Sequence, residues 1–141
     1  MFRKTGFNGR NNGDASMIKL IVFLLLLISA IAHAELPSAT ATVVNQVLVS
    51  GKPTIIDLGA RTCIPCKKMA PILEGLSKEY KGKANVLFID VREDSAAGDR
   101  FKVRMIPTQI FFDAKGKEVS RHIGFMDKAA ILKGLKGAGL K

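Results

Sequence analysis

Tryptophan is absent from this sequence of 141 residues, and only one tyrosine is present. The formal net charge is +10, but lysines and acidic residues alternate through residues 74–99 rather than forming one basic stripe. A nucleic-acid-binding surface normally combines a clustered basic patch with aromatic side chains that stack on bases. The composition therefore argues against nucleic-acid binding, and we predict no nucleic-acid partner.

Cysteine and histidine are nearly as scarce. The chain has two cysteines, Cys63 and Cys66, and two histidines, His33 and His122. Structural zinc normally needs four Cys or His ligands, and His122 lies far along the chain from the cysteine pair. We therefore predict no metal site.

No apolar run is long enough to make a permanent transmembrane helix the favoured interpretation. Residues 20–32 form a run of 13 apolar or small residues that follows Lys19 and ends in the small-x-small pattern of residues 32–34. As a helix this run spans about 20 Å, whereas a bilayer core is about 30 Å thick. We predict that residues 1–34 are an N-terminal extension and signal peptide, with Met17 as a candidate true start. Residues 35–141 are then the exported, periplasmic domain, soluble after cleavage, with an uncleaved membrane anchor as the alternative.

Helical and strand patterns alternate along the rest of the chain. Apolar positions at helical spacing predict helices, and short apolar runs bounded by turn-forming residues predict strands. We expect helices at residues 41–48, 63–80, 95–101 and after Asp127, and strands at residues 53–58, 85–90, 106–112 and 117–123. Parallel strands need crossover helices, whereas the last two strands need only the turn between them. The order therefore predicts an α/β fold with a central mixed β-sheet flanked by helices on both faces.

Three local expectations concern single side chains. Ser38 is expected to cap the first helix. In the helix at residues 63–80, Met69 and Leu73 mark the buried face and Glu74 the exposed one. Gly134 is expected to loosen the end of the last helix, together with the glycines that follow it.

The two cysteines are separated by only two residues. A disulfide at this spacing closes a very short loop and restricts the unfolded chain little, so a purely stabilising role is the weaker interpretation. Cys63 stands at the start of the expected helix, where backbone N–H groups and the helix dipole favour a thiolate, and Lys67 and Arg61 add positive charge. Pro65 suits the first helical turn. We therefore predict a redox pair with Cys63 as the nucleophile and Cys66 as the resolving thiol.

Several motifs at matching distances resemble the thioredoxin family. They are a strand at residues 53–57, the Cys-Ile-Pro-Cys centre at residues 63–66, Pro71, the loop Ile106-Pro107-Thr108, and Gly124. The similarity covers about residues 53–135. It implies the thioredoxin fold, a cis peptide bond before Pro107, and disulfide exchange with protein substrates. We expect a monomer. No cofactor is expected beyond the Cys63–Cys66 disulfide.

The resemblance also implies a role for each residue of the site. Cys63 attacks a substrate disulfide, and Cys66 then resolves the mixed disulfide. Asp57 matches a buried acid that assists deprotonation of the second cysteine, with a solvated carboxylate at the strand end as the alternative. Pro107 places its loop beside the sulfurs, with an ordinary trans proline as the alternative. The expected substrate-binding residues are Ile64, Pro65, Ile106 and Thr108.

Several positions depart from the family pattern. Thr62 stands where the family usually has a tryptophan before the first cysteine, Ile64 replaces a glycine between the cysteines, and Gly59 replaces a second aromatic residue upstream. Phe88 stands where the family has a lysine near the buried acid. These changes alter the surface that meets substrates and the delivery of protons, so they argue against a broad substrate range.

An exported reductase needs an electron source, because the periplasm is kept oxidising. Exported thioredoxin-like proteins resemble the partners of membrane thiol-disulfide transporters (DsbD/CcdA type). We predict such a transporter as electron donor, and cytochrome c maturation components or misoxidised proteins as substrates. Pro65 is typical of the reducing branch, since strong oxidases usually have a histidine between the cysteines. A disulfide oxidase or isomerase is one alternative, and a non-catalytic thioredoxin-fold binding module is another.

Overall fold

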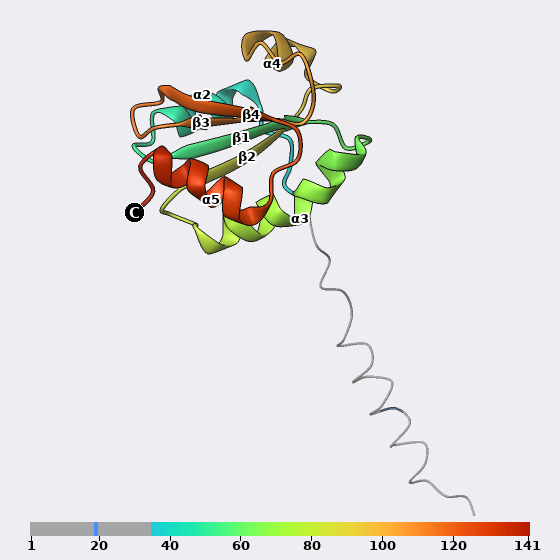
Figure 1. Cartoon of the computed structure of the whole chain (residues 1–141). Helices are drawn as coiled ribbons and strands as arrows, with labels where there is room; N and C mark the ends of the chain where they lie inside the picture. The colour runs from blue at the N-terminus through green and yellow to red at the C-terminus, as the bar shows by residue number, and fades with distance from the viewer. Residues whose placement is uncertain (1–18, 20–34) are drawn as a thin grey trace, which may run out of the picture. The chain divides into compact units, whose positions relative to one another are not determined.

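The computed structural model describes residue 19 and residues 35–141 (Figure 1). The predicted signal peptide, its cleavage after Ala34 and the alternative start at Met17 lie outside the described residues. Within the described part of the chain, no helix is both long and apolar enough to cross a membrane.

Helices and strands alternate as the sequence predicts, and their bounds differ from the predicted ones by at most two residues. In chain order they are α2 (Ala41–Leu48), β1 (Thr54–Gly59), α3 (Ile64–Glu79), β2 (Asn85–Asp90), α4 (Ser95–Arg100), β3 (Thr108–Phe112), β4 (Glu118–Ile123) and α5 (Lys128–Gly137). Helix α3 continues through Pro71 without interruption.

The four strands form one mixed sheet in the order β2-β1-β3-β4. Strands β1 and β2 are parallel and are joined by the crossover helix α3, whereas β3 runs antiparallel to both of its neighbours. Leu58 near the end of β1 pairs with Thr108 at the start of β3. The segment that leaves β1 and the loop that enters β3 therefore lie at the same edge of the sheet.

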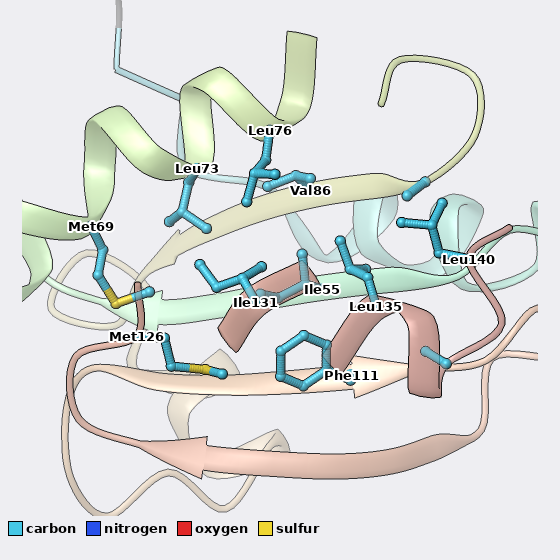
Figure 2. Close-up of a cluster of buried hydrophobic side chains, with 12 residues drawn as sticks. Ile55, Met69, Leu73, Leu76, Val86, Phe111, Met126, Ile131, Leu135 and Leu140 are labelled. Carbon is cyan, nitrogen blue, oxygen red and sulfur yellow. The ribbon is translucent and has the colours of Figure 1, made fainter. Parts of the chain in front are cut away.

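Helices cover both faces of the sheet, which confirms the predicted architecture. On one face, Ile55 and Phe111 from the strands pack with Leu73 of α3 and Ile131 of α5 (Figure 2). The opposite face holds a second cluster built from α2, α4 and the alternate strand positions, with Val44, Ile56, Leu58, Ile89, Ala97, Ile110 and Phe112 buried. Because side chains alternate along a strand, Asp57 shares the face of Ile55, beneath α3 and α5.

The expected cap of α2 was wrong by two residues. The Oγ1 atom of Thr40 accepts a hydrogen bond from the backbone N–H of Val43, so Thr40 is the N-cap. Ser38 instead accepts a hydrogen bond from the backbone N–H of Asp90 at 2.9 Å. Ser38 therefore fastens the segment before α2 to the end of β2.

The expected positions of Glu74 in α3 and of Gly134 in α5 were also wrong. Glu74 is buried, with 5% of its surface exposed, and its carboxylate accepts a hydrogen bond from Lys78 one turn later. That partner compensates part of the cost of burying the charge. Gly134 lies within α5 against the ring of Phe111, where an added Cβ atom would come within 2.5 Å of the ring. Gly134 therefore permits close packing of α5 on the sheet rather than loosening the helix end.

Candidate active site

The cysteine pair lies where β1 passes into α3. The backbone N–H of Cys63 donates to the carbonyl of Ala60 at 3.0 Å, which forms a turn, and Cys63 then serves as the N-cap of α3. Cys63 and Cys66 form a disulfide, with their Cα atoms 5.2 Å apart. Cys66 is only 5% exposed, whereas Cys63 is half-buried and its neighbour Ile64 is 71% exposed. A partner protein therefore reaches Cys63 more readily than Cys66.

The start of α3 favours negative charge at Cys63. The first turn of any helix presents backbone N–H groups that have no partner within the helix, and the positive end of the helix dipole points the same way. Pro65 has no N–H group, so its place in this first turn sacrifices no hydrogen bond. Lys67 and Lys68 follow as exposed cations. Once the disulfide is reduced, these features stabilise a Cys63 thiolate.

Gly59 makes room for the buried end of the cysteine pair. A Cβ atom at this position would lie 3.0 Å from Sγ of Cys66 and 3.3 Å from the ring of Phe88. Both distances are shorter than ordinary van der Waals contact between carbon or sulfur atoms. The departure of Gly59 from the family pattern therefore has a local reason: the Phe88 ring and Cys66 occupy the space that a side chain would need.

The loop before β3 has the predicted cis peptide bond between Ile106 and Pro107, so the alternative of a trans proline was wrong. The carbonyl of Pro107 accepts a hydrogen bond from the backbone N–H of Gly124 at 2.8 Å. Thr108 donates its hydroxyl to the carbonyl of Met105 at 2.6 Å and is only 2% exposed. The Thr108 side chain thus holds the loop rather than facing a substrate. Substrate binding by Ile64, Pro65, Ile106 and Thr108 stays a prediction.

Asp57 is a buried acid, with 1% of its surface exposed, so the alternative of a solvated carboxylate was wrong. Burial raises the pKa of Asp57 from 3.8 to about 6, and a hydrogen bond from Gln109 partly offsets that rise. Nε2 of Gln109 donates to Oδ1 of Asp57 at 2.8 Å. Oδ2 has no hydrogen-bond partner within the described part of the chain. A carboxyl group with a pKa near neutrality can accept and release a proton under ordinary conditions.

A small pocket touches both Asp57 and Cys66. Its volume is about 20 Å³, and its wall also includes Leu36, Arg61 and Phe88. A space of this size holds roughly one water molecule. The buried acid and the buried cysteine therefore share one confined space beneath the start of α3.

Sequence reasoning missed two features of this site. The first is Gln109 in the strand Thr-Gln-Ile-Phe-Phe. It lies two residues before Phe111 and therefore on the same face of the sheet, so a polar residue on an apolar face was the signal that could have revealed it. The second feature is the side chain of Arg61, which pairs with Glu35, donates to the carbonyl of Leu36 at 2.9 Å, and lies 5.1 Å from the centre of the Phe88 ring. No local signal predicts those contacts, because Glu35 is 26 residues away from Arg61 in the chain.

Metal binding finds no support at this site. Among the residues that the structure describes, no three His, Cys, Asp or Glu side chains gather where they could hold a metal ion. His122 lies exposed on β4 and pairs in register with Gln109, whose side chain is buried.

Comparisons with known proteins agree with the geometry. A family model described as Thioredoxin matches residues 36–137. The thioredoxin of Staphylococcus saprophyticus is 43% identical over 74 residues, which are 52% of this chain and 70% of that protein. The bifunctional thioredoxin reductase/thioredoxin of Mycobacterium leprae is 39% identical over 90 residues, which are 64% of this chain and 19% of that longer protein. Among solved structures, a mutant thioredoxin from Halobacterium salinarum NRC-1 matches with a TM-score of 0.65 and 27% identity, covering 78% of this chain and 95% of that one.

Proposed function

Because this chain belongs to the thioredoxin family, whose members are protein-disulfide reductases that act through their own disulfide, we propose that it is an exported reductase with Cys63 as nucleophile and Cys66 as resolving cysteine. The observation that carries this assignment of roles is the unequal exposure of the two sulfur-bearing residues. Cys66 is buried beside Asp57, whereas Cys63 lies half-buried at the start of α3 next to exposed Ile64.

The reaction begins from the reduced dithiol. The Cys63 thiolate attacks one sulfur of a substrate disulfide, a bond forms between Cys63 and that sulfur, and the other substrate sulfur leaves as a thiolate and takes up a proton. The Cys66 thiol then loses its proton and attacks Sγ of Cys63. The Cys63–Cys66 disulfide forms, and the second substrate sulfur leaves as a thiol. Two electrons pass from the cysteine pair to the substrate, and the protein ends in the disulfide state that the structure shows.

We propose that Asp57 takes the proton of Cys66 in the second step. Both residues line the same small pocket, which has room for about one water molecule. With a pKa of about 6, Asp57 is mostly ionised at pH 7 and is a base of suitable strength for this transfer. The Cys66 attack would therefore slow as the pH falls below about 6.

The reducing direction and the exported location rest on the sequence. Pro65 in the first turn of α3 replaces the histidine that strong oxidases usually carry between the cysteines, and the apolar run before Ala34 supports export. In an oxidising compartment the spent disulfide must be reduced again, and a membrane thiol-disulfide transporter (DsbD/CcdA type) is the proposed donor. Titrating the Cys63/Cys66 pair against glutathione separates the alternatives, since a strongly reducing potential supports a reductase and an oxidising one supports an oxidase or isomerase.

Cysteine substitutions test the assigned roles directly. Cys66→Ser is expected to accumulate mixed disulfides between Cys63 and substrate proteins, because the resolving thiol is gone. Cys63→Ser is expected to abolish insulin reduction, and Thr62→Ser, which alters only the neighbouring exposed side chain, is the matched control with near-normal activity. Mixed disulfides are detected on non-reducing gels. A Cys63→Ser protein that reduced insulin at the normal rate would overturn the proposal, and a Cys66→Ser protein that trapped nothing would favour a binding module.

A further inference from the structure

Gln109 is a buried amide aimed at the carboxylate of Asp57. The two residues stand directly opposite each other on the antiparallel strands β1 and β3, and both belong to the face of the sheet covered by α3. Gln109 has 0% of its surface exposed. Its Nε2 donates to Oδ1 of Asp57 at 2.8 Å and lies 3.2 Å from Sδ of Met69 on α3. The strand register therefore fixes the amide against one oxygen of the acid.

Packing alone does not explain an amide at this position. A buried amide is costly unless its hydrogen bonds are made, and within the described residues Oε1 of Gln109 has no partner. An apolar side chain of similar size would avoid that cost, and the three residues that follow Gln109 in β3 are all apolar. Only the NH₂ side of the amide can face an ionised carboxylate, since two oxygens would repel each other. The arrangement thus favours a charged Asp57.

We propose that Gln109 is a positioning residue for disulfide exchange: it occupies Oδ1 of Asp57, holds the carboxylate in its charged form, and leaves Oδ2 free to accept the proton of Cys66. The proposal rests on the role proposed above for Asp57. It adds a residue that makes no hydrogen bond to either cysteine in the described structure and acts through the acid.

No other described side chain donates a hydrogen bond to Asp57. The titratable or charged groups that line the pocket with it are Cys66 and Lys67 from α3, Arg61 from the preceding loop, and Glu35 from the N-terminal segment. Strand β2 presents Phe88, which carries no charge. Removing the amide of Gln109 therefore changes the direct hydrogen bonding of the acid while those four groups stay in place.

The test is Gln109→Leu, which keeps approximate volume and removes the donor. A hydrogen bond to a charged group is strong enough that its loss is expected to raise the pKa of Asp57 by about one unit, measured by carbon-13 NMR of the carboxyl group. The rate of Cys66 attack is measured in single turnovers at a series of pH values. The pH below which this rate falls should rise by the same amount. For a base that must be ionised, this means a loss of about five-fold at pH 6 and almost none at pH 8.

Two controls separate positioning from packing. Met69→Leu removes the sulfur beside the amide and keeps the Asp57–Gln109 bond, so the Asp57 titration should stay in place. In an Asp57→Asn background, Gln109→Leu should have no further effect on the pH profile, because the residue through which it acts is absent. Gln109→Met is the second donor-free variant if Gln109→Leu does not fold.

Results that contradict the role of Gln109 differ from results that contradict the proposed reductase function. An unchanged Asp57 pKa in the donor-free variants, or an equal slowing at every pH that persists without Asp57, would overturn the role of Gln109. Failure of the unaltered protein to reduce insulin would instead overturn the proposed function, and the NMR titration would still decide whether Gln109 controls Asp57.

Discussion

At Asp57 the requirements of folding and of chemistry oppose each other. Burial raises its pKa from 3.8 to about 6, because a charged carboxylate is less stable beneath α3 than in water. Below pH 3.8 the group is protonated in the folded and the unfolded chain alike. Between pH 3.8 and 6 the unfolded chain loses the proton first, so this group lowers the free energy of unfolding as the pH rises. Above pH 6 the penalty is constant at about 3 kcal/mol.

We therefore expect Asp57→Asn to stabilise the protein at pH 8 by up to about 3 kcal/mol, because asparagine carries no charge to bury. The advantage should shrink as the pH falls and nearly vanish near pH 4. Urea denaturation at a series of pH values measures it. Asp99→Asn, at an exposed position, is the matched control and should show no such trend. An advantage of equal size at pH 4 and pH 8 would show that Asp57 is not destabilised by its charge.

At the level of elements, the contact between α5 and β3 depends on a missing side chain. Gly134 brings the helix so close to Phe111 that a Cβ atom would lie 2.5 Å from the ring, whereas a Cβ atom at Gly137 would meet nothing within 4 Å. Both glycines belong to α5, so both replacements by alanine gain similar helix propensity. They differ in whether the added methyl group fits.

Gly134→Ala is expected to lower the free energy of unfolding by roughly 1–3 kcal/mol, because the ring or the helix must shift to admit the methyl group. Gly137→Ala should be neutral or slightly stabilising. Urea denaturation of both variants gives the comparison. Equal stability of the two would mean that Phe111 moves aside at little cost and that close packing here does not need glycine.

The elements themselves were largely predictable from the sequence. Their patterns are local: β2 is an apolar run with turn formers around it, and α2 and β2 were predicted with the bounds that the structure has. The errors arose where tertiary contacts decide. The spacing of Glu74 predicts an exposed position, yet Glu74 is buried. Gly134 was predicted to loosen the helix end, but it allows α5 to pack closely against Phe111. Such contacts join residues that no local pattern connects.

At the scale of the whole molecule, the candidate active site also combines features that local motifs predict with contacts between distant parts of the chain. Short motifs indicate Cys63, Cys66, Asp57 and Pro107 as candidate site residues, whereas the hydrogen bond between Asp57 and Gln109 spans 52 residues of sequence. The N-terminal segment was missed for the same reason. Its Leu36 forms part of the pocket wall beside Asp57 and Cys66, and Arg61 holds this segment through Glu35 and the Leu36 carbonyl. Residues 35 and 36 therefore help to limit the access of bulk water to Asp57.

Leu36→Ala tests whether that segment controls the acid. Shortening a half-buried side chain should cost about 1 kcal/mol of stability and admit water to the pocket. Less desolvation should move the pKa of Asp57 down from about 6 toward 3.8, which is opposite in sign to the expected effect of removing the Gln109 donor. Carbon-13 NMR titration and urea denaturation of the full chain measure both effects. Glu79→Gln is the control: it removes an exposed ion pair with Lys128, and neither residue lines the pocket, so it should cost less than about 1 kcal/mol and leave the Asp57 titration in place. If Leu36→Ala left the pKa of Asp57 unchanged, the raised value would have to come from the sheet and α3 alone, and the N-terminal segment would only add stability.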